Sequence, residues 1–219
     1  MNQGKKINAY CEAHTTLPVP ELYELERETH LCTLSPHMIS GRLQGHLLML
    51  LTTLARPMLA LEIGTFTGYA SICIAKGLPD GGMLHTIEIN PELAPISRKY
   101  FEKTGLLDKI TAHTGDAREV IPSLHLQFDL VFIDAAKFDY LFYYELLIEK
   151  VNPGGLLIAD NVLWAGKVVT QAVDADTQNL EAFNKMVHDD PRVENLMLPI
   201  RDGLLVVRKA KHQVQPSSI

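Results

Sequence analysis

Acidic side chains recur at the ends of apolar segments in the middle of this sequence. Five segments that read as buried strands each end at or just before an acid, namely Glu62, Glu88, Asp116, Asp134 and Asp160. In an open parallel sheet the carboxyl ends of the strands meet at one edge, where ligands bind. Any one of these acids is explained equally well as a helix cap. Five carboxylates along one edge repel each other, so the set favours a bound metal ion or a cationic ligand.

Two of these acids and a neighbouring amide form a candidate metal site. Asp134 ends one strand, and Asp160 at the end of the next is followed directly by Asn161. An Asp-Asn pair by itself is typical of a turn or a helix cap. Together the three residues offer hard oxygen ligands without histidine or thiolate, which suits Mg²⁺, Mn²⁺ or Ca²⁺ better than zinc. Three protein ligands also leave coordination positions open to substrate, as a catalytic metal requires.

Lys137 is the candidate catalytic base, together with Asp134 three residues before it. It lies close to the start of a predicted helix, where a cation opposes the helix dipole, so stability alone does not favour it. A solvated lysine is the simpler alternative, but beside a metal site this amine is placed to act as a base. Trp164 follows the Asp-Asn pair and could pack against an aromatic substrate, although a lone tryptophan is more often part of a core.

The segment 59–69, LALEIGTFTGY, begins as an apolar run, breaks at Gly64 and Gly68, and leads into a helix-compatible segment. This order predicts a strand, a tight turn and a helix whose first N–H groups face a ligand. The turn lacks the third glycine of dinucleotide-binding motifs, and Glu62 would repel a phosphate. Glu88 ends the next strand, where such folds bind ribose hydroxyls. Together these features predict an adenosyl ligand without phosphates.

Apolar runs and amphipathic segments alternate along the chain. Strands are expected at 59–62, 83–87, 110–114, 130–133, 156–159, 193–198 and 204–207. Helices are expected at 20–31, 40–54, 70–75, 91–104, 118–124, 138–150 and 177–188. The alternation predicts an α/β fold with a single Rossmann-like, doubly wound sheet, mostly parallel, with a C-terminal antiparallel hairpin and helices on both faces.

The length of 219 residues is that of one domain, which we divide into an N-terminal arm and helix (1–35), a core (36–209) and a frayed tail (210–219). Residues 1–18 are polar and without pattern, which predicts a loosely held arm. The helix at 40–54 is expected to carry a leucine face made of Leu43, Leu47, Leu50, Leu51 and Leu54.

Composition limits the classes of function. A net charge of -6 argues against nucleic-acid binding, which usually needs a basic face. No segment resembles a signal peptide or is apolar for long enough to span a bilayer, so we expect a soluble protein without membrane association. The cysteines have neither metal-ligand nor disulfide-framework spacing, which predicts reduced thiols and a cytoplasmic location, with Cys73 on a buried helix face: Cys11, Cys32 and Cys73.

These segments, taken together, resemble the cation-dependent class I S-adenosylmethionine O-methyltransferases. This is the family of caffeoyl-CoA O-methyltransferases, their bacterial relatives and, more distantly, catechol O-methyltransferase. The resemblance covers about 36–209 and rests on six motifs in order: LEIGTFTGY (61–69), IEIN (87–90), GDA (115–117), FIDAAKFDY (132–140), DNVLWAG (160–166) and LPIRDGL (198–204). Any one of these motifs is weak, but the ordered set is specific.

The resemblance implies roles for individual residues. Asp134, Asp160 and Asn161 would be the metal ligands, and Lys137 the catalytic lysine. Residues expected to bind S-adenosylmethionine are Met38, Ser40, Glu62, Gly64, Thr65, Gly68, Glu88, Asp116, Ala117 and Asp134. Of these, Met38 and Ser40 would cover the cofactor and Ala117 would lie by the adenine. The resemblance also implies a homodimer formed through the N-terminal helices.

Three alanines depart from the plant pattern of serine, aspartate and asparagine: Ala70, Ala136 and Ala165. The third lies beside the expected substrate mouth, and the segment from Lys167 to Asp176 is short for a plant-type substrate loop. Both features favour a bacterial-type enzyme with a small catechol-like acceptor over one specific for caffeoyl-CoA. The expected reaction is metal-dependent methyl transfer to one hydroxyl of a vicinal diol. The alternatives are a nucleotide-binding oxidoreductase and a non-catalytic module that binds the methyl donor.

Overall fold

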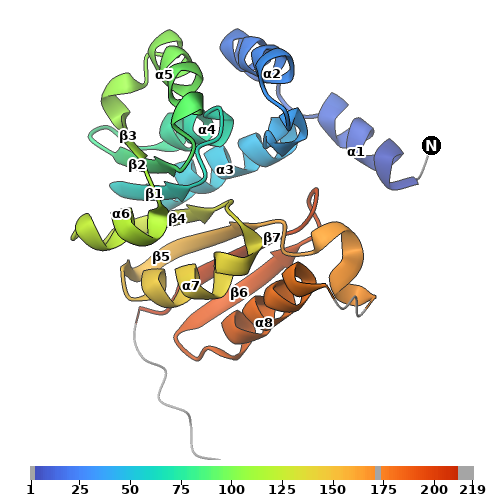
Figure 1. The fold of residues 1–219 in the computed structure, drawn as a ribbon, viewed down its shortest axis with the longest axis vertical. Coiled ribbons are helices and arrows are strands. Elements are labelled where there is room, and N and C mark those ends of the chain that lie inside the picture. The colour runs from blue at the N-terminus through green and yellow to red at the C-terminus, as the bar shows by residue number, and fades with distance from the viewer. Residues whose placement is uncertain (1–2, 171–173, 212–219) are drawn as a thin grey trace, which may run out of the picture.

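The computed structural model of the protein describes residues 3–170 and 174–211. The strands are β1 (Leu59–Ile63), β2 (Met83–Glu88), β3 (Ile110–Thr114), β4 (Phe128–Ile133), β5 (Val151–Asp160), β6 (Val193–Leu198) and β7 (Leu204–Lys209). In the described residues they form a seven-stranded sheet in the order β3-β2-β1-β4-β5-β7-β6 (Figure 1). The first five strands are parallel, and β7 is antiparallel to both β5 and β6.

Helices lie on both faces of this sheet (Figure 1). They are α1 (Gln3–Ala13), α2 (Pro20–Cys32), α3 (Gly41–Ala55), α4 (Tyr69–Gly77), α5 (Ala94–Lys103), α6 (Ala117–Ser123), α7 (Tyr140–Ile148) and α8 (Ala175–Asp189). Short 3-10 turns include η1 (Pro36–Met38), η4 (Lys137–Asp139) and η5 (Trp164–Val169). One apolar cluster joins α2, α3, α4 and α5 to the sheet, and a second joins α6, α7 and α8 to its other face. The predicted fold class is confirmed.

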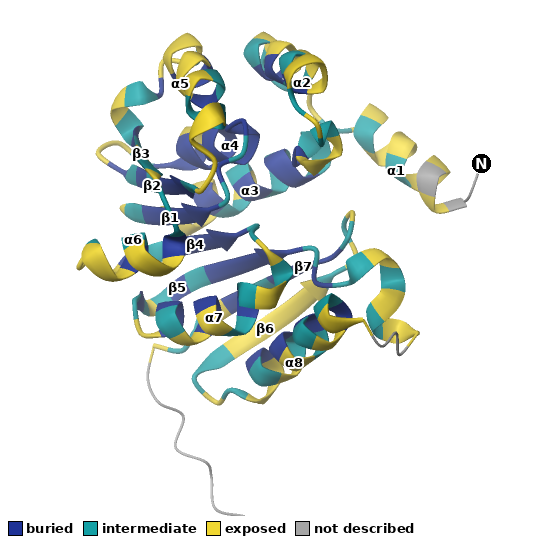
Figure 2. Cartoon of the chain, viewed as in Figure 1, coloured by how far each residue is buried: buried dark blue, intermediate teal, exposed yellow. Residues whose placement is uncertain are grey.

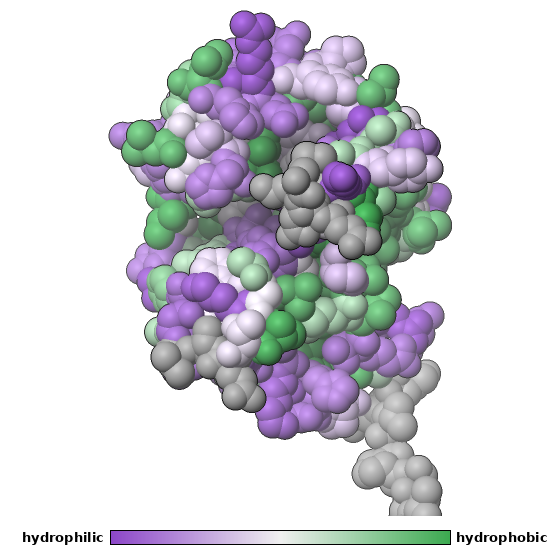
Figure 3. All heavy atoms as spheres, turned by 90° about the vertical axis from the view of Figure 1, so that its right-hand side faces the viewer, coloured by the Kyte–Doolittle hydropathy of each residue, from purple (hydrophilic) through white to green (hydrophobic). Residues whose placement is uncertain are grey.

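Burial follows the layers of the fold. The central strands β1 and β4 are buried along nearly their whole length, as expected for parallel strands covered on both faces. The edge strand β6 is mostly exposed (Figure 2). On the side from which α1 projects, hydrophilic and hydrophobic side chains are mixed (Figure 3). None of the described helices is long and apolar enough to cross a membrane.

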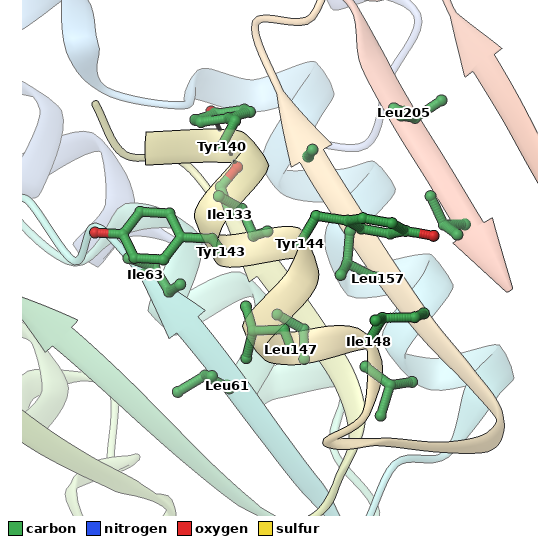
Figure 4. Close-up of a cluster of buried hydrophobic side chains, with 14 of the residues drawn as sticks. Leu61, Ile63, Ile133, Tyr140, Tyr143, Tyr144, Leu147, Ile148, Leu157 and Leu205 are labelled. Atoms are coloured by element: carbon green, nitrogen blue, oxygen red, sulfur yellow. Dashed lines mark hydrogen bonds between the residues drawn. The ribbon is translucent and has the colours of Figure 1, made fainter. Parts of the chain in front are cut away.

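The helix α7 is apolar except for the exposed Glu145, and it packs against the sheet and against α8. Tyr140, Tyr143 and Tyr144 extend from it among aliphatic side chains of the sheet (Figure 4). The rings of Tyr140 and Tyr144 each meet Phe183 of α8 edge-on, with centroids 5.3 and 6.1 Å apart. This packing fixes the start of α7, which follows the 3-10 turn η4 that begins with the candidate catalytic lysine.

Within the segment 1–18, predicted to be a loosely held arm without pattern, residues Gln3–Ala13 form the helix α1, which the sequence analysis did not predict. The segment lacks an apolar stripe, but it contains good helix formers, and Asn8 donates to Glu12 one turn later at 2.9 Å. Intrinsic helix propensity and local side-chain pairing thus produced a helix that the search for apolar periodicity did not reveal.

The predicted leucine face of α3 is only partly turned to the core, where Leu47 and Leu51 pack against the apolar cluster from half-buried positions. The buried residues are Gln44, Gly45, Leu48 and Thr52, whereas Leu50 and Leu54 are 55% and 79% exposed. The small Gly45 lets α3 pack closely against α4, and this close approach decides which face is turned inward. Leu50 and Leu54 therefore remain available for other contacts.

Candidate functional site

The strand order brings the five acids to one edge of the sheet, as the alternation of elements predicted. Glu88 and Asp160 end β2 and β5, Asp134 follows β4 directly, Glu62 is the penultimate residue of β1, and Asp116 lies two residues beyond β3. The strand order reverses at β1, which lies between β2 and β4. Open α/β sheets bind ligands at such a switch point.

The turn after β1 needs both of its glycines for steric reasons. Gly64 has φ +97°, and a Cβ there would lie 2.0 Å from the carbonyl oxygen of Asp134. Gly68 also has φ +97°, and its Cβ would lie 2.7 Å from a ring carbon of Phe101. The first glycine lets the ends of β1 and β4 approach, and the second lets α4 begin against α5. Contact of either glycine with a cofactor stays a prediction.

Glu62 is a fully buried carboxyl below this turn. Its Oε2 accepts hydrogen bonds from Ser71 and from Thr86, the latter at 2.6 Å, and Thr86 in turn lies 2.5 Å from the Thr65 hydroxyl. Burial raises the pKa of Glu62 to about 8. Its Oε1 has no hydrogen-bond partner within the described part of the chain. A buried oxygen of this kind fits a bound group that carries a donor.

Glu88 has a different environment, since it is partly exposed. Its Oε2 accepts from the backbone N–H of Phe66 at 2.7 Å, and its Oε1 accepts from that of Asn90 at 2.9 Å. A carboxylate oxygen can accept a second hydrogen bond, so Glu88 retains capacity for ligand hydroxyls. The Glu88 carboxylate thus fixes the glycine turn and can also accept hydrogen bonds from a ribose there.

Asp116 acts as the cap of α6. Its carboxylate accepts from the backbone N–H of Arg118 at 2.9 Å and from the guanidinium of the same residue at 2.7 Å. These bonds lower the pKa of Asp116. The next residue, Ala117, is buried. The helix-cap interpretation accounts for the contacts of Asp116, and a role for either residue in cofactor binding stays a prediction.

The predicted metal ligands come together at the ends of β4 and β5. Asp160 is 3% exposed, and its Oδ1 accepts from the backbone N–H of Asn161 at 2.7 Å. Burial and the nearby charge of Asp134 raise the pKa of Asp160 above its usual range. Within residues 3–170 and 174–211, no group of three or more His, Cys, Asp or Glu side chains is placed to hold a metal ion. A cation between the two carboxylates would therefore depend on Asn161 for its third oxygen ligand.

Lys137 lies next to this carboxylate pair at the start of η4. Its Nζ is 3.4 Å from Asp134 Oδ1 and 2.8 Å from the hydroxyl of Tyr140. The Tyr140 hydroxyl also lies 2.9 Å from the backbone carbonyl oxygen of Asp160, to which it can donate. Only about a tenth of the lysine side chain is exposed. The simpler alternative of a solvated lysine does not describe this residue. Tyr140, which sequence reasoning did not single out, holds the amine at the site.

Gln44 is a second residue that the sequence reasoning missed. It lies in the first turn of α3, is fully buried, and its Nε2 donates to Asp160 Oδ2 at 2.7 Å. Its Oε1 accepts from Arg201 Nη1 at 3.3 Å. The signal in the sequence is a glutamine within an apolar helix. The contact itself joins residues 116 positions apart, and no local pattern predicts such a pair.

The segment expected to cover the cofactor precedes α3. Met38 ends η1 and is 55% exposed, whereas Ser40 is buried. Arg201 Nη1 donates to the backbone carbonyl oxygens of Ile39, at 2.9 Å, and of Ser40. A hollow of about 310 Å³ adjoins the segment, between α1, α2 and the start of α3. Hydrogen bonds from Arg201 thus connect the segment before α3 to the loop between β6 and β7.

The loop after β5 has an unusual backbone. Asn161, Trp164 and Ala165 all have positive φ, at +58°, +47° and +52°. Trp164 packs against the core cluster of α7 and α8, and its indole N–H has no partner within the described residues. Of the three alanines that depart from the plant pattern, Ala136 and Ala165 are exposed and Ala70 is buried. The exposed Ala165 lies beside the predicted metal ligands in the chain.

Fold and site together define a class of protein. A doubly wound sheet, a glycine turn without phosphate-binding character and carboxylates on the first two strands describe an α/β protein that binds an adenosyl ligand at its switch point. Oε1 of Glu62, which lacks a partner among the described residues, and the lone pairs of Glu88 fit such a ligand. The oxygen donors of Asp134, Asp160 and Asn161 fit a hard divalent cation.

A sequence model of the O-methyltransferase family matches residues 12–210, so the chain belongs to this family. Caffeoyl-CoA O-methyltransferase 2 of Petunia hybrida is 36% identical over 180 residues, which cover 76% of this chain and 74% of the relative. The resemblance inferred from the six motifs is thereby confirmed.

Solved structures agree with this assignment. The O-methyltransferase TomG of Streptomyces achromogenes, in complex with S-adenosylmethionine, matches with a TM-score of 0.88, 27% identity and coverage of 96% of this chain and 99% of its own. An O-methyltransferase of Bacillus cereus, in complex with S-adenosylhomocysteine, matches with a TM-score of 0.87, 28% identity and coverage of 93% and 97%. The protein is an S-adenosylmethionine-dependent O-methyltransferase, so the oxidoreductase and the non-catalytic module are set aside.

Proposed function

We propose that the protein methylates one hydroxyl of a vicinal-diol, catechol-like aromatic acceptor with the help of a divalent cation, Mg²⁺ first and Mn²⁺ or Ca²⁺ as alternatives. The cation would be held by Asp134, Asp160 and Asn161. The observation that carries the proposal is the pair of carboxylates at the ends of β4 and β5, one of them buried, with Lys137 against the other. Placing two carboxylates next to each other, one of them buried, is costly unless a cation offsets their repulsion.

The chain's own residues would align the reactants and handle a proton. Bound at the carboxylate pair, the cation would supply Lewis acidity toward both acceptor oxygens. Lys137, whose Nζ donates to the Tyr140 hydroxyl at 2.8 Å, either takes the proton of the reacting hydroxyl or stabilises the loss of that proton. The oxygen lone pair forms the bond to the methyl carbon as the carbon–sulfur bond breaks, which leaves S-adenosylhomocysteine. Alignment is the largest contribution that the fold can make to such a transfer.

The methyl donor would lie along the glycine turn. Glu88 would accept from the ribose hydroxyls. A cationic donor group on the ligand would favour the charged form of Glu62, whose Oε1, without a partner among the described residues, would then accept from it. The backbone around Gly64 would pass close to the ligand, and Met38 and Ser40 would cover it. The remaining residues proposed to contact the donor are Thr65, Gly68, Asp116, Ala117 and Asp134.

A small free catechol is the acceptor that we favour over a CoA thioester. Ala165 leaves the exposed loop after β5 without the asparagine of the plant pattern. The segment from Lys167 to Asp176 is short, although residues 171–173 lie outside the described part of the chain. Both features remove side chains that a large acyl-CoA acceptor would contact.

Methyl transfer to catechol and to phenol, each with Mg²⁺ and with excess chelator, tests the proposal. We expect transfer to catechol with Mg²⁺ and little with chelator or with phenol. Phenol offers one oxygen instead of two, and its hydroxyl, with a pKa of about 10 as in tyrosine, stays protonated at neutral pH. Full activity in chelator, or equal rates on both acceptors, would refute the metal-dependent mechanism. A parallel comparison of caffeate with caffeoyl-CoA tests the preference for a free acid.

A further inference from the structure

A continuous chain of hydrogen bonds leads from the loop between β6 and β7 to the buried metal-ligand candidate. Arg201 donates to the side-chain oxygen of Gln44 at 3.3 Å, and the side-chain nitrogen of Gln44 donates to Asp160 Oδ2 at 2.7 Å. Arg201 also holds the backbone carbonyls of Ile39 and Ser40 just before α3. Three elements distant in the sequence therefore meet at one glutamine.

The orientation of the Gln44 amide follows from its two partners. A guanidinium can only donate hydrogen bonds, and a carboxylate without its proton can only accept them. The amide oxygen must therefore face Arg201 and the amide nitrogen must face Asp160. A reversed amide would place two acceptors against each other at Asp160 and two donors at Arg201. Arg201 thus selects the amide orientation that serves the carboxylate.

The second oxygen of Asp160 is also held, because Oδ1 accepts from the N–H of Asn161 at 2.7 Å. Each oxygen of the carboxylate then has one protein donor and keeps further lone-pair capacity. The plane of the carboxylate is fixed from both sides, while Gln44 itself is fully buried and excludes water from this side. Residues that orient ligands in this way tune metal affinity without touching the metal.

We infer that Gln44 and Arg201 form a positioning relay, in which Arg201 orients the Gln44 amide and Gln44 presents the Asp160 carboxylate to a divalent cation. The inference rests on the proposed function, since it concerns the same cation site. The same guanidinium nitrogen of Arg201 donates to the backbone of Ile39 and Ser40. The relay therefore also connects the segment expected to cover the cofactor with the cation site. Gln44 and Arg201 are positioning residues, and neither is placed to touch the cation.

Manganese binding to the full-length chain, followed by the electron paramagnetic resonance of free Mn²⁺ without acceptor, tests the relay. Gln44→Met keeps the length of the side chain but removes both hydrogen bonds, and we expect about a tenfold or greater loss of Mn²⁺ affinity. Arg201→Met should weaken Mn²⁺ binding in the same direction. In the double variant Arg201→Met should add almost nothing, because its effect passes through Gln44.

Thr52→Val is the matched control on the same helix. It removes a buried hydrogen bond, which Thr52 Oγ1 donates to the Leu48 carbonyl oxygen at 2.7 Å. We expect this variant to lose stability while its Mn²⁺ affinity stays unchanged. Unchanged affinity in Gln44→Met, or additive losses in the double variant, would overturn the relay. If Asp160→Asn still abolishes binding in that case, the proposed cation site stands without it. A wild-type chain that binds no Mn²⁺ would overturn both.

Discussion

Lys137 illustrates how single side chains are prepared for a reaction. A cation at a helix start is unfavourable by the dipole argument, yet here its amine is held by the Tyr140 hydroxyl at 2.8 Å and by Asp134 at 3.4 Å. The ammonium also lies 4.8 Å from the centre of the Tyr140 ring. These contacts fix the amine beside the carboxylate pair.

Lys137→Ala should therefore lower turnover far more than it lowers binding of the methyl donor. Loss of a positioned base costs on the order of 10²- to 10⁴-fold in rate, while calorimetric titration with S-adenosylhomocysteine should give nearly the wild-type affinity. Lys185→Ala in α8 is the control, since that side chain is 77% exposed and pairs only locally in the described structure, with Asp189 one turn later at 2.6 Å. Equal losses in turnover and donor affinity would contradict the assignment.

Glu62 makes stability depend on pH. Burial raises its pKa to about 8 in the folded protein, against 4.5 for an ordinary glutamate. Below pH 4.5 the carboxyl is protonated in both the folded and the unfolded state. The contribution of Glu62 to the free energy of unfolding is then fully present. Between 4.5 and 8 the folded state binds more protons than the unfolded state, so the free energy of unfolding falls as the pH rises. The charged form is the costly one in this site.

Glu62→Gln removes this titration. We expect the difference in unfolding free energy between variant and wild type to shift in favour of the variant from pH 5 to pH 8, measured by urea unfolding without ligand. Taking the difference cancels the opposite trend of His85 and His113, whose pKa values burial lowers. The stability that these two neutral histidines contribute is lost as the pH falls below about 6.5. A flat difference curve would show that Glu62 is charged in the fold.

At the scale of elements, the crossing of α3 over α4 depends on Gly45. A Cβ there would lie 2.7 Å from both Cys73 Sγ and a ring carbon of Tyr69. We expect Gly45→Ala to destabilise the protein by about 1–3 kcal/mol, as overpacking does, seen as a lower urea midpoint. Gly4→Ala in α1 is the control, because nothing lies within 4 Å of its added Cβ. A midpoint for Gly45→Ala at or above that of the control would contradict the close crossing.

The sequence predicted the elements well where periodicity and turn residues agree. The strands of the parallel sheet were found because their apolar runs end at acids or glycines. The helix α1 was missed because it has no apolar stripe, and the inward face of α3 was misjudged because Gly45 and Gln44 decide it through contacts with distant elements. The pairing of Gln44 with Asp160 depends on the assembled fold and has no local signal.

The whole molecule leaves apolar side chains uncovered on the outer side of α3 and just after it. Leu50, Leu54 and Met58 are 55%, 79% and 52% exposed. Exposed groups of this kind mark interaction sites when they are contiguous. The leucines lie on the face that the sequence predicted to be apolar and that the sheet does not cover. A second copy of the chain, related by a two-fold axis, can bury such a face against itself.

We therefore expect a homodimer formed through the N-terminal helices, with α3 at its centre. Sedimentation velocity at micromolar concentration should give the mass of two chains. Leu54→Lys should shift the equilibrium toward one chain, because it places a charge in the buried centre of the interface. Phe142→Lys is the matched control, since Phe142 is 44% exposed on α7, which packs on the other face of the sheet from α3, and it should leave the dimer intact. A monomeric wild-type chain would refute the dimer, and loss of the dimer in the control variant alone would place the interface at α7.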